Sequence, residues 1–586
     1  MNGTARPPLS HNNDFSADSM RFSTPPAEQP ADSGLPPIPA WLFLLIAVAW
    51  LLPGLIGHEP WKPDEAYTFG LVRHIAETGD WIVPTLAGEP FMEKPPLFFI
   101  SAAFTMQLFG GWLSAPDAAR LAAGGWMALA LAGTAVSAGA LYGRRAAAWG
   151  ALLLLGCLGL PMRAHQMITD TALLAGVAWG LAGLVLLRRR AWLGGALLGL
   201  GGGAAFLSKG LLGPGCLGLT ALLLPLHPDY RNRRYAGGLL LAALIGLPLA
   251  ALWGLSLYLR DPALFQLWFK VNNFGRFDGS AHLGPKAPRL FYGRTLPWYG
   301  IPVLPLALWG LWRGRRQWTR AWPAAPALLW LVTLTVLSLA GDARELYAMP
   351  LLLPLALLAI TGLRAGEAHR GWRALSGFSL LLCLTLGAVV LAIAWVLSTG
   401  EPAQFARHLL HRKFTDWHPQ WHPWTWMAFG LIAGGVACLW RRFPSNTAPG
   451  FAWRWSLTIV LLWGGLATLW LPALDHGMRY RETFAPLRPV LADIGRQGEC
   501  VASVGLGEPQ RALLDYYADY RTLRLESTPQ AKNCRWLLVQ SLHDQLPPYL
   551  AGLKPAESFQ RPGDPKERFR LYRLEQPLGL LLKAKK

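Results

Sequence analysis

The chain has 586 residues, of which 53% are apolar and only 15% are charged, and its net charge is +20. Soluble domains hold about 25% charged residues, so this composition excludes an ordinary soluble protein. The basic residues lie in short loops between apolar segments, as the positive-inside rule describes, so the positive charge gives no reason to expect a nucleic-acid partner.

Residues 1–38 are rich in Pro, Ser, Asn and Asp, and we predict that they form a disordered cytoplasmic tail. They lack the layout of a cleavable signal peptide. Residues 39–474 then hold a series of apolar blocks of about 17–25 residues, the length that crosses a hydrocarbon core of ~30 Å. This region is therefore expected to be the transmembrane domain.

Loop charge indicates how many of these blocks cross the membrane. From Arg144 onward, clusters of arginine occupy every second loop and should be cytoplasmic. With the N-terminus inside, this pattern fits only if one early block does not span. The block at 93–111 is short and opens with Glu-Lys-Pro-Pro, so we read it as an interfacial helix on the outer surface. The sequence thus predicts a polytopic α-helical membrane protein of about 13 transmembrane helices, with its N-terminus cytoplasmic and its C-terminus outside.

This topology makes residues 58–116 the first external loop and residues 260–290 the second large external loop. Membrane-level carboxylates can act as general bases or can position a nucleophile. Cationic side chains and a tyrosine hydroxyl can hold a phosphate. Together they indicate a phospholipid-like substrate, and the residues that supply these groups on the external side are Asp64, Glu65, Glu93, Lys94, Asp170, Asn273, Arg276, Arg344 and Tyr347.

Each of these residues also has a structural interpretation. Interfacial Lys, Arg and Tyr are common membrane anchors, and an acidic pair such as Asp64-Glu65 is usually a solvated surface. Asp170 lies in MITDTALL, where it could cap the helix that follows. Lys209, in the SKG turn between two helices, reads as an interface residue. The glycines of GLGGGAAF, residues 199–206, favour close helix packing over a nucleotide site.

Residues 475–586 form a separate tail, which we expect to be a small α/β domain. The predicted strands are 500–506, 521–525, 534–540 and 568–574, and the predicted helix is 508–520. Cys500 and Cys534 could form a disulfide if this tail faces an oxidising compartment.

The segment KPDEAYTFGLVRHIAETGDWIVPTLAGEPFMEKPPLFF, residues 62–99, resembles the first external loop of the bacterial aminoarabinose transferases. These belong to the GT-C class of polytopic glycosyltransferases, which also includes the protein O-mannosyltransferases. Further matching pieces follow in the same order as in that family: MITDTAL, SKG, FGRF and ELYAMPLLLPLAL. The resemblance spans about residues 40–365, and the later helices and the tail agree in layout only.

The resemblance implies thirteen membrane helices, with interfacial helices in the external loops and a small α/β domain on the periplasmic side. It carries the catalytic acid over to Asp64, the donor phosphate to Lys94, Arg276 and Tyr347, and further acidic site positions to Glu93 and Asp170. We predict Glu65 and Asp170 as catalytic residues beside Asp64, and Asn273 and Arg344 as further site residues. Many relatives carry a His near the position of Asn273. Because an amide is a poorer ligand for zinc-like ions, no metal or other cofactor is expected.

The implied function is inverting transfer of a sugar from an undecaprenyl-phosphate donor to a periplasmic acceptor at the bacterial inner membrane. The acceptor that fits the resemblance best is lipid A, with 4-amino-4-deoxy-L-arabinose as the sugar, and a monomer is expected. A protein or polysaccharide glycosyltransferase of the same fold is the alternative. The alternatives from other functional classes are a lipid-linked sugar transporter or flippase and a non-catalytic scaffold.

Overall fold

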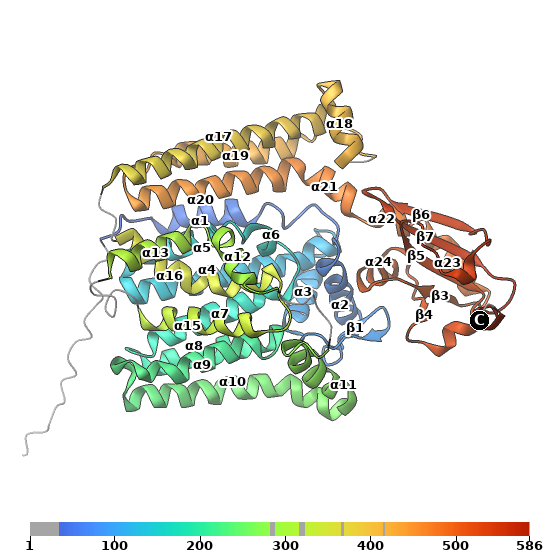
Figure 1. Cartoon of the computed structure of the whole chain (residues 1–586), viewed down its shortest axis with the longest axis horizontal. Coiled ribbons are helices and arrows are strands. Elements are labelled where there is room, and N and C mark those ends of the chain that lie inside the picture. The colour runs from blue at the N-terminus through green and yellow to red at the C-terminus, as the bar shows by residue number, and fades with distance from the viewer. Residues whose placement is uncertain (1–33, 282–287, 316–322, 365–367, 414–415, 585–586) are drawn as a thin grey trace, which may run out of the picture.

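Most of the chain is a bundle of helices whose axes run roughly parallel, with a smaller domain that contains a β-sheet at one end (Figure 1). The computed structural model describes residues 34–281, 288–315, 323–364, 368–413 and 416–584. The predicted tail therefore lies outside the described residues up to residue 33. Its boundary at 38 is wrong, because Leu35 is buried and Pro36 accepts a hydrogen bond from the Trp149 indole.

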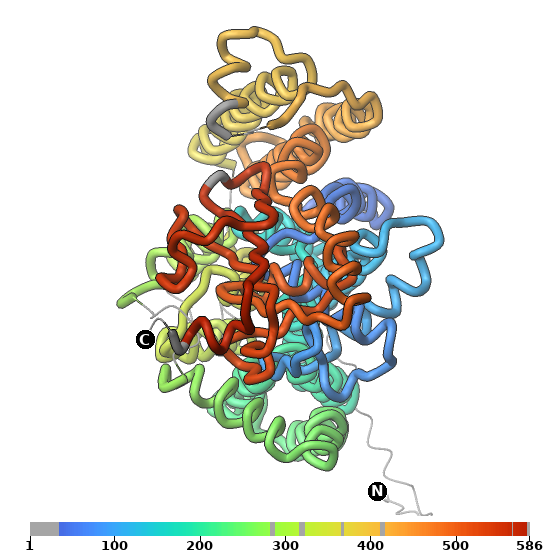
Figure 2. The backbone as a smooth tube through the Cα atoms, turned by 90° about the vertical axis from the view of Figure 1, so that its right-hand side faces the viewer, coloured from blue at the N-terminus to red at the C-terminus, as the bar shows by residue number. Residues whose placement is uncertain are grey.

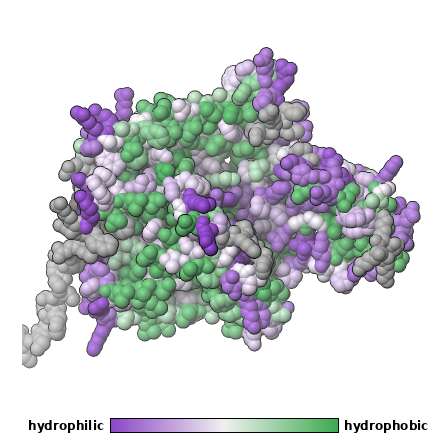
Figure 3. All heavy atoms as spheres, viewed as in Figure 1, coloured by the Kyte–Doolittle hydropathy of each residue, from purple (hydrophilic) through white to green (hydrophobic). Residues whose placement is uncertain are grey.

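The bundle combines buried central helices with helices that expose apolar side chains. α7 and α16 are almost wholly buried, whereas α10 and α17 turn rows of leucines outward, as lipid-facing helices do. Apolar residues cover the visible face of the bundle (Figure 3). Over the described residues, seven helical stretches are long and apolar enough to cross a membrane, so the protein is polytopic. The bundle helices are α1 (Ala40–Leu51), α4 (Ala115–Tyr142), α5 (Arg144–Leu155), α7 (Thr169–Leu186), α8 (Ala191–Lys209), α9 (Leu212–Leu223), α10 (Arg233–Arg260), α13 (Val303–Arg313), α15 (Ala324–Leu339), α16 (Met349–Arg364), α17 (Arg370–Thr399), α19 (Pro423–Leu439) and α20 (Ala448–Gly465).

Glycines let α7 and α8 pack with their backbones in contact. A Cβ at Gly201 would lie 2.4 Å from the backbone nitrogen of Gly180, and one at Gly183 would lie 2.5 Å from that of Leu198. The predicted packing role of the glycines in 199–206 is confirmed. Because the two helices are antiparallel neighbours, the start of α7 and the end of α8 lie together, which brings Asp170 to Lys209.

Short elements connect the helices at the end of the bundle that faces the sheet domain. The helix predicted at 93–111 is α3, which begins after Pro96. It has 13 residues, and it buries Phe98 and Phe99 while exposing Phe104 and Leu108. The other short elements are α2 (Asp64–Thr78), β1 (Thr85–Leu86), β2 (Glu89–Pro90), α3 (Leu97–Phe109), α6 (Pro161–Ala164), α11 (Pro262–Gln266), the π-helix η3 (Leu267–Gly275), α12 (Phe291–Tyr299), η4 (Glu345–Ala348), α18 (Ala403–Lys413) and α21 (Leu471–Met478).

The C-terminal domain is built on a five-stranded sheet of order β4-β3-β5-β7-β6, in which β3 pairs in parallel with β4 and β5 and the remaining pairs are antiparallel. The five elements predicted between 500 and 574 have counterparts in β3, α24, β4, β5 and β7. Cys500 and Cys534, which precede β3 and β5, form a disulfide. The elements are α22 (Arg481–Phe484), α23 (Leu487–Arg496), β3 (Val501–Val504), α24 (Glu508–Ala518), β4 (Leu523–Arg524), β5 (Trp536–Leu542), β6 (Glu557–Arg561), β7 (Asp564–Arg573) and α25 (Leu578–Ala584).

The C-terminal domain is fastened to the 58–116 loop by charged contacts. Glu89 of β2 accepts hydrogen bonds from Arg511 and Arg524, each at 2.9 Å. Tyr517 of α24 donates to Glu59 at 2.8 Å. Helix α24 thereby lies on α2, and the end-on view shows the domain covering the end of the bundle (Figure 2).

Candidate active site

One polar cavity of about 350 Å³ lies between the ends of the bundle helices and the C-terminal domain. Segments from seven parts of the chain contribute to it, which explains why no short motif could define it. Its charged and hydroxyl-bearing residues are Asp64, Tyr67, Glu93, Lys94, Asp170, Lys209, Arg276, Arg344, Tyr347 and Glu508.

Asp64 opens helix α2 and faces this cavity. One turn later, the Tyr67 hydroxyl donates to Asp64 Oδ1 at 2.9 Å and accepts from Lys94 Nζ at 2.6 Å. Burial, and then the neighbouring Asp64 carboxylate, raise the pKa of Tyr67 well above its ordinary value. The phenol therefore keeps its proton and links the carboxylate to the ammonium.

Asp170 lies in the first turn of α7 and forms a close ion pair with Lys209 at the end of α8. The capping role considered for Asp170 is wrong, because Ile168 is the N-cap and no side chain caps this helix. Lys209 also lies 4.2 Å above the ring of Tyr347, in the range of a cation–π contact. Lys209, for which the sequence indicated only an interface position, thus lines the cavity.

Arg276 follows the π-helix η3 and lies opposite Lys94 and Tyr347 in the cavity lining. Its guanidinium lies 3.4 Å from Glu93 Oε2 and 4.0 Å from Asp342 Oδ2. Its Nε atom and both carboxylate oxygens of Asp342 are buried without a hydrogen-bond partner. An arginine held this loosely retains donors for a ligand.

A second cavity of about 370 Å³ adjoins the first and has a different lining. Both cavities are lined by Glu93, Lys94, Lys209, Arg276 and Tyr347. The rest of the second cavity is mostly apolar, with Leu211, Leu212, Gly215, Cys216, Phe274, Phe277, Val336, Leu337 and Ala340. A cationic cluster therefore lies where a polar chamber meets an apolar one.

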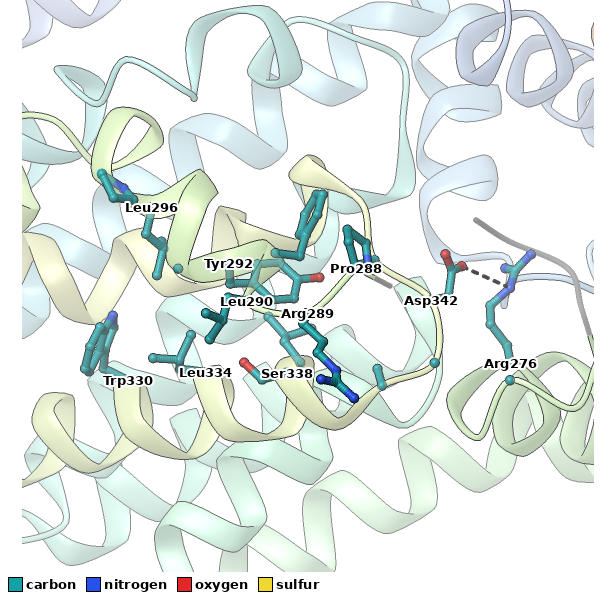
Figure 4. A pocket seen from close by; sticks show the side chains of 18 of the residues that line it. Arg276, Pro288, Arg289, Leu290, Tyr292, Leu296, Trp330, Leu334, Ser338 and Asp342 are labelled. Carbon is teal, nitrogen blue, oxygen red and sulfur yellow. Dashed lines mark ion pairs between the residues drawn. The ribbon is translucent and has the colours of Figure 1, made fainter. Parts of the chain in front are cut away.

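A third and larger cavity, of about 1230 Å³, lies on the far side of Asp342. In Figure 4 the Arg276–Asp342 pair marks its polar end, and Leu290, Trp330 and Leu334 line its apolar end. The two apolar cavities share Arg276 and Asp342, so both border the same charged pair.

Glu65, the neighbour of Asp64, does not line any of these three cavities. Consecutive helical residues point about 100° apart, so when Asp64 faces the cavity Glu65 faces the interior. There its carboxylate pairs with the wholly buried Arg120 at 2.9 Å and accepts from the Met167 backbone N–H at 2.9 Å. Burial alone would raise the pKa of Glu65, but Arg120 holds it below the ordinary value. The geometry makes Glu65 a structural anion rather than a second catalytic acid.

Asn273 lines the apolar cavity, but both ends of its side-chain amide form hydrogen bonds within the protein. Its Oδ1 accepts from the Leu211 backbone N–H at 3.4 Å and its Nδ2 donates to the Trp268 carbonyl at 2.9 Å. Gly210, with φ +76°, lies so close that a Cβ there would be 2.3 Å from Asn273 Oδ1. Asn273 thus fastens η3, which precedes Arg276, to the end of α8.

Three cavity residues were missed by the sequence reasoning. Tyr67 could have been found, because it lies one helical turn after Asp64. The sequence around Lys209 indicated only a turn. Glu508 begins α24 in the separate domain, where no local signal points to the bundle. Burial, and then nearby Glu93, raise the pKa of the Glu508 carboxyl.

In the part of the chain that the structure describes, no group of three or more His, Cys, Asp or Glu side chains is arranged to hold a metal ion. The polar cavity is instead lined by cations and single carboxylates. This donor set suits an anionic ligand better than a divalent cation.

The chain matches no protein-family model. It is similar to curated proteins named undecaprenyl phosphate-alpha-4-amino-4-deoxy-L-arabinose arabinosyl transferase. It is 28% identical to the one from Aeromonas hydrophila over 407 residues, which cover 64% of this chain and 70% of the relative. It is 32% identical to that from Pseudomonas aeruginosa over 372 residues, 60% of this chain and 64% of the relative. It is 27% identical to that from Edwardsiella ictaluri over 444 residues, 72% of this chain and 74% of the relative.

The fold is similar to the crystal structures of ArnT from Cupriavidus metallidurans. The structure bound to undecaprenyl phosphate gives a TM-score of 0.64 at 20% identity, and the match covers 91% of this chain and 97% of the solved one. The apo structure gives 0.65 at 18% identity, with the same coverage. The chain is thus similar in sequence to the aminoarabinose transferases that its 62–99 segment resembles, and similar in fold to the ArnT structures.

Proposed function

We propose that the protein transfers a sugar from an undecaprenyl-phosphate donor to an acceptor at the periplasmic face of the bacterial inner membrane. Its relatives' name supports 4-amino-4-deoxy-L-arabinose as the sugar. Lipid A is the proposed acceptor. In this proposal the chain is a monomer with about 13 crossings, a cytoplasmic N-terminus and a periplasmic C-terminal domain. The Cys500–Cys534 disulfide supports that side, because disulfides persist in oxidising compartments.

The observation that carries this proposal is the cationic cluster shared by the polar and the apolar cavity. A polyprenyl phosphate has a long apolar tail, a charged phosphate and, in the donor, a sugar beyond the phosphate. Lys94, Lys209 and Arg276 lie where the phosphate would sit if the tail occupied the apolar cavity. The sugar would then lie in the polar cavity beside Asp64.

This arrangement fits direct displacement at the anomeric carbon. An acceptor oxygen attacks that carbon, the bond from carbon to the phosphate oxygen breaks, and the phosphate leaves with the electron pair. Negative charge grows on the leaving phosphate, so cations fixed around it stabilise the transition state more than the ground state. Attack from the face opposite the phosphate inverts the configuration.

Asp64 has the position of the catalytic acid in this scheme. For a hydroxyl acceptor it would act as general base, because the attacking oxygen must lose a proton. For a phosphate acceptor, which is already anionic, it would orient the acceptor or balance the amine of the sugar. The Tyr67 and Lys94 contacts fix the carboxylate for either role.

Mass spectrometry of lipid A from cells with and without the protein tests this function. We expect an added mass of one amino sugar, which is lost with Asp64→Asn. Glu77→Gln is the matched control, because Glu77 is an exposed acid of the same helix that pairs with Arg73 and does not line the cavity. Unmodified lipid A in cells that make both protein and donor would contradict the lipid A assignment. Periplasmic glycoproteins and glycans of the same cells would then report a different acceptor.

A further inference from the structure

Glu567, on strand β7 of the C-terminal domain, is a fully buried carboxylate with five side-chain donors around it. Its Oε2 accepts from Tyr480 at 2.7 Å and from Lys62 at 2.9 Å, and Arg561 lies 3.3 Å away. Its Oε1 accepts from two amides, those of Gln510 at 2.9 Å and Gln540 at 2.8 Å. Burying a charge is costly, so this many donors on one carboxylate indicate a fixed geometry.

Two of these donors adjoin residues that line the polar cavity. Lys62 comes just before Pro63 and Asp64, which line the cavity from the 58–116 loop. Gln510 comes just after Glu508 and Pro509, which line the cavity from the C-terminal domain. One carboxylate therefore holds two backbone segments, from different domains, that line the same cavity.

We propose that Glu567 is a positioning residue that sets the place of Asp64 by holding Lys62 and Gln510 together. This inference rests on the proposed function, since it assumes that Asp64 acts on a bound sugar. Glu567 does not line the cavity. It acts through Lys62, because Pro63 leaves only one residue between the anchored lysine and the aspartate.

The rate should depend strongly on this anchor. Catalytic groups must be held within about 0.5 Å of their productive geometry, and a misplacement of about 1 Å can cost 10²-fold in rate. Lys94, Lys209 and Arg276 lie on segments that Glu567 does not contact. Loss of the anchor should therefore lower kcat while donor binding persists.

The test is purified protein in proteoliposomes, with kcat and donor KM measured for Glu567→Gln. Glutamine has a single acceptor oxygen, and its NH₂ group would face a side chain that is itself a donor. It therefore cannot accept hydrogen bonds from both Lys62 and Gln510. We expect kcat to fall by about 10- to 100-fold and donor KM to stay within about twofold. Lys62→Met should reproduce this loss, and the double variant should be no slower than either single variant.

Glu89→Gln is the matched control. It breaks two ion pairs between the same loop and the same domain, those with Arg511 and Arg524, without touching Lys62 or Gln510. We expect it to keep a kcat near that of the unaltered protein. An unchanged kcat in Glu567→Gln, an equal loss in Glu89→Gln, or additive losses in the double variant would overturn the proposal.

Hydrogen exchange separates this proposal from the proposed function. In Glu567→Gln, the backbone amides of 61–68 and 508–512 should exchange faster, while those of β3 and β5 stay protected. If the unaltered protein transferred no sugar, the proposed function would fail, and the exchange experiment would still report on the anchor. Unchanged exchange in both segments would show that Glu567 holds neither segment.

Discussion

Glu65→Gln should destabilise the fold, although Glu65 adjoins the proposed catalytic Asp64. The substitution removes the charge that faces Arg120, whose side chain is wholly buried and whose remaining carboxylate partner is Asp117 at 2.9 Å. Removing one partner of a buried ion pair costs about 3–5 kcal/mol. Because Asp117 remains, we expect a loss of unfolding free energy near the lower end, about 3 kcal/mol.

The assay pairs two adjacent substitutions. Thermal unfolding in detergent, followed by size exclusion, measures stability, and transfer per folded molecule measures chemistry. Glu65→Gln should unfold at a clearly lower temperature, and its surviving molecules should transfer sugar. Asp64→Asn should unfold close to the unaltered protein and transfer none, because Asp64 is partly exposed and, among the described residues, hydrogen-bonds to the side chain of Tyr67 alone.

A double substitution sharpens the test. Replacing both ions of a buried pair by apolar residues of similar size is often neutral. Glu65→Leu with Arg120→Met should therefore recover part of the stability that either single change loses. A stable but inactive Glu65→Gln protein would refute this reasoning and would indicate that Glu65 takes part in catalysis.

Three further predictions follow from the same contacts. Lys209→Met should lower kcat by about 10²-fold, because it removes a cation from the leaving phosphate and leaves Asp170 unpaired; a rate near the unaltered value in proteoliposomes would contradict this. Arg120 lowers the folded-state pKa of Glu65 below its ordinary 4.5, so the stability that the pair contributes is present above about pH 4.5 and is lost as the pH falls through the folded value. The thermal midpoint should drop below that pH, and it should drop less in Glu65→Gln. Cys534→Ser opens a loop of 34 residues closed with Cys500, which should cost about 4 kcal/mol in the chain-entropy model, measured by thermal unfolding without reductant; an unchanged midpoint would argue against the disulfide.

The helical architecture could be predicted from the sequence because each apolar block carries its own signal. Block length and loop charge are local properties, so they indicate a polytopic helical protein without knowledge of any long-range contact. A helix in the 93–111 block was also predictable, and it begins directly after two prolines. The predicted disordered cytoplasmic tail stays a prediction for residues 1–33, which lie outside the described residues.

The candidate site could be predicted only in part, because it depends on which way side chains point. Asp64, Lys94, Arg276 and Tyr347 line one cavity, as the resemblance implies. Glu65 does not line this cavity, because adjacent residues of a helix do not share a face.

Lys209 and Glu508 were missed for a different reason. Lys209 reaches the cavity through the close packing of two helices, and Glu508 through the docking of a domain. Both are long-range events without a local sequence signature.

The docked C-terminal domain also bears on how the protein is made. Ribosomes release the chain from its N-terminus, so Asp64, Lys94 and Lys209 enter the membrane region long before Glu508 and Glu567 exist. Until residues 475–586 are synthesised and folded, the polar cavity lacks the part of its lining that Glu508 and Pro509 supply. A partly synthesised chain would thus hold Lys94 and Lys209 beside an incomplete polar cavity, which is completed only once the C-terminal domain has folded against the end of the bundle.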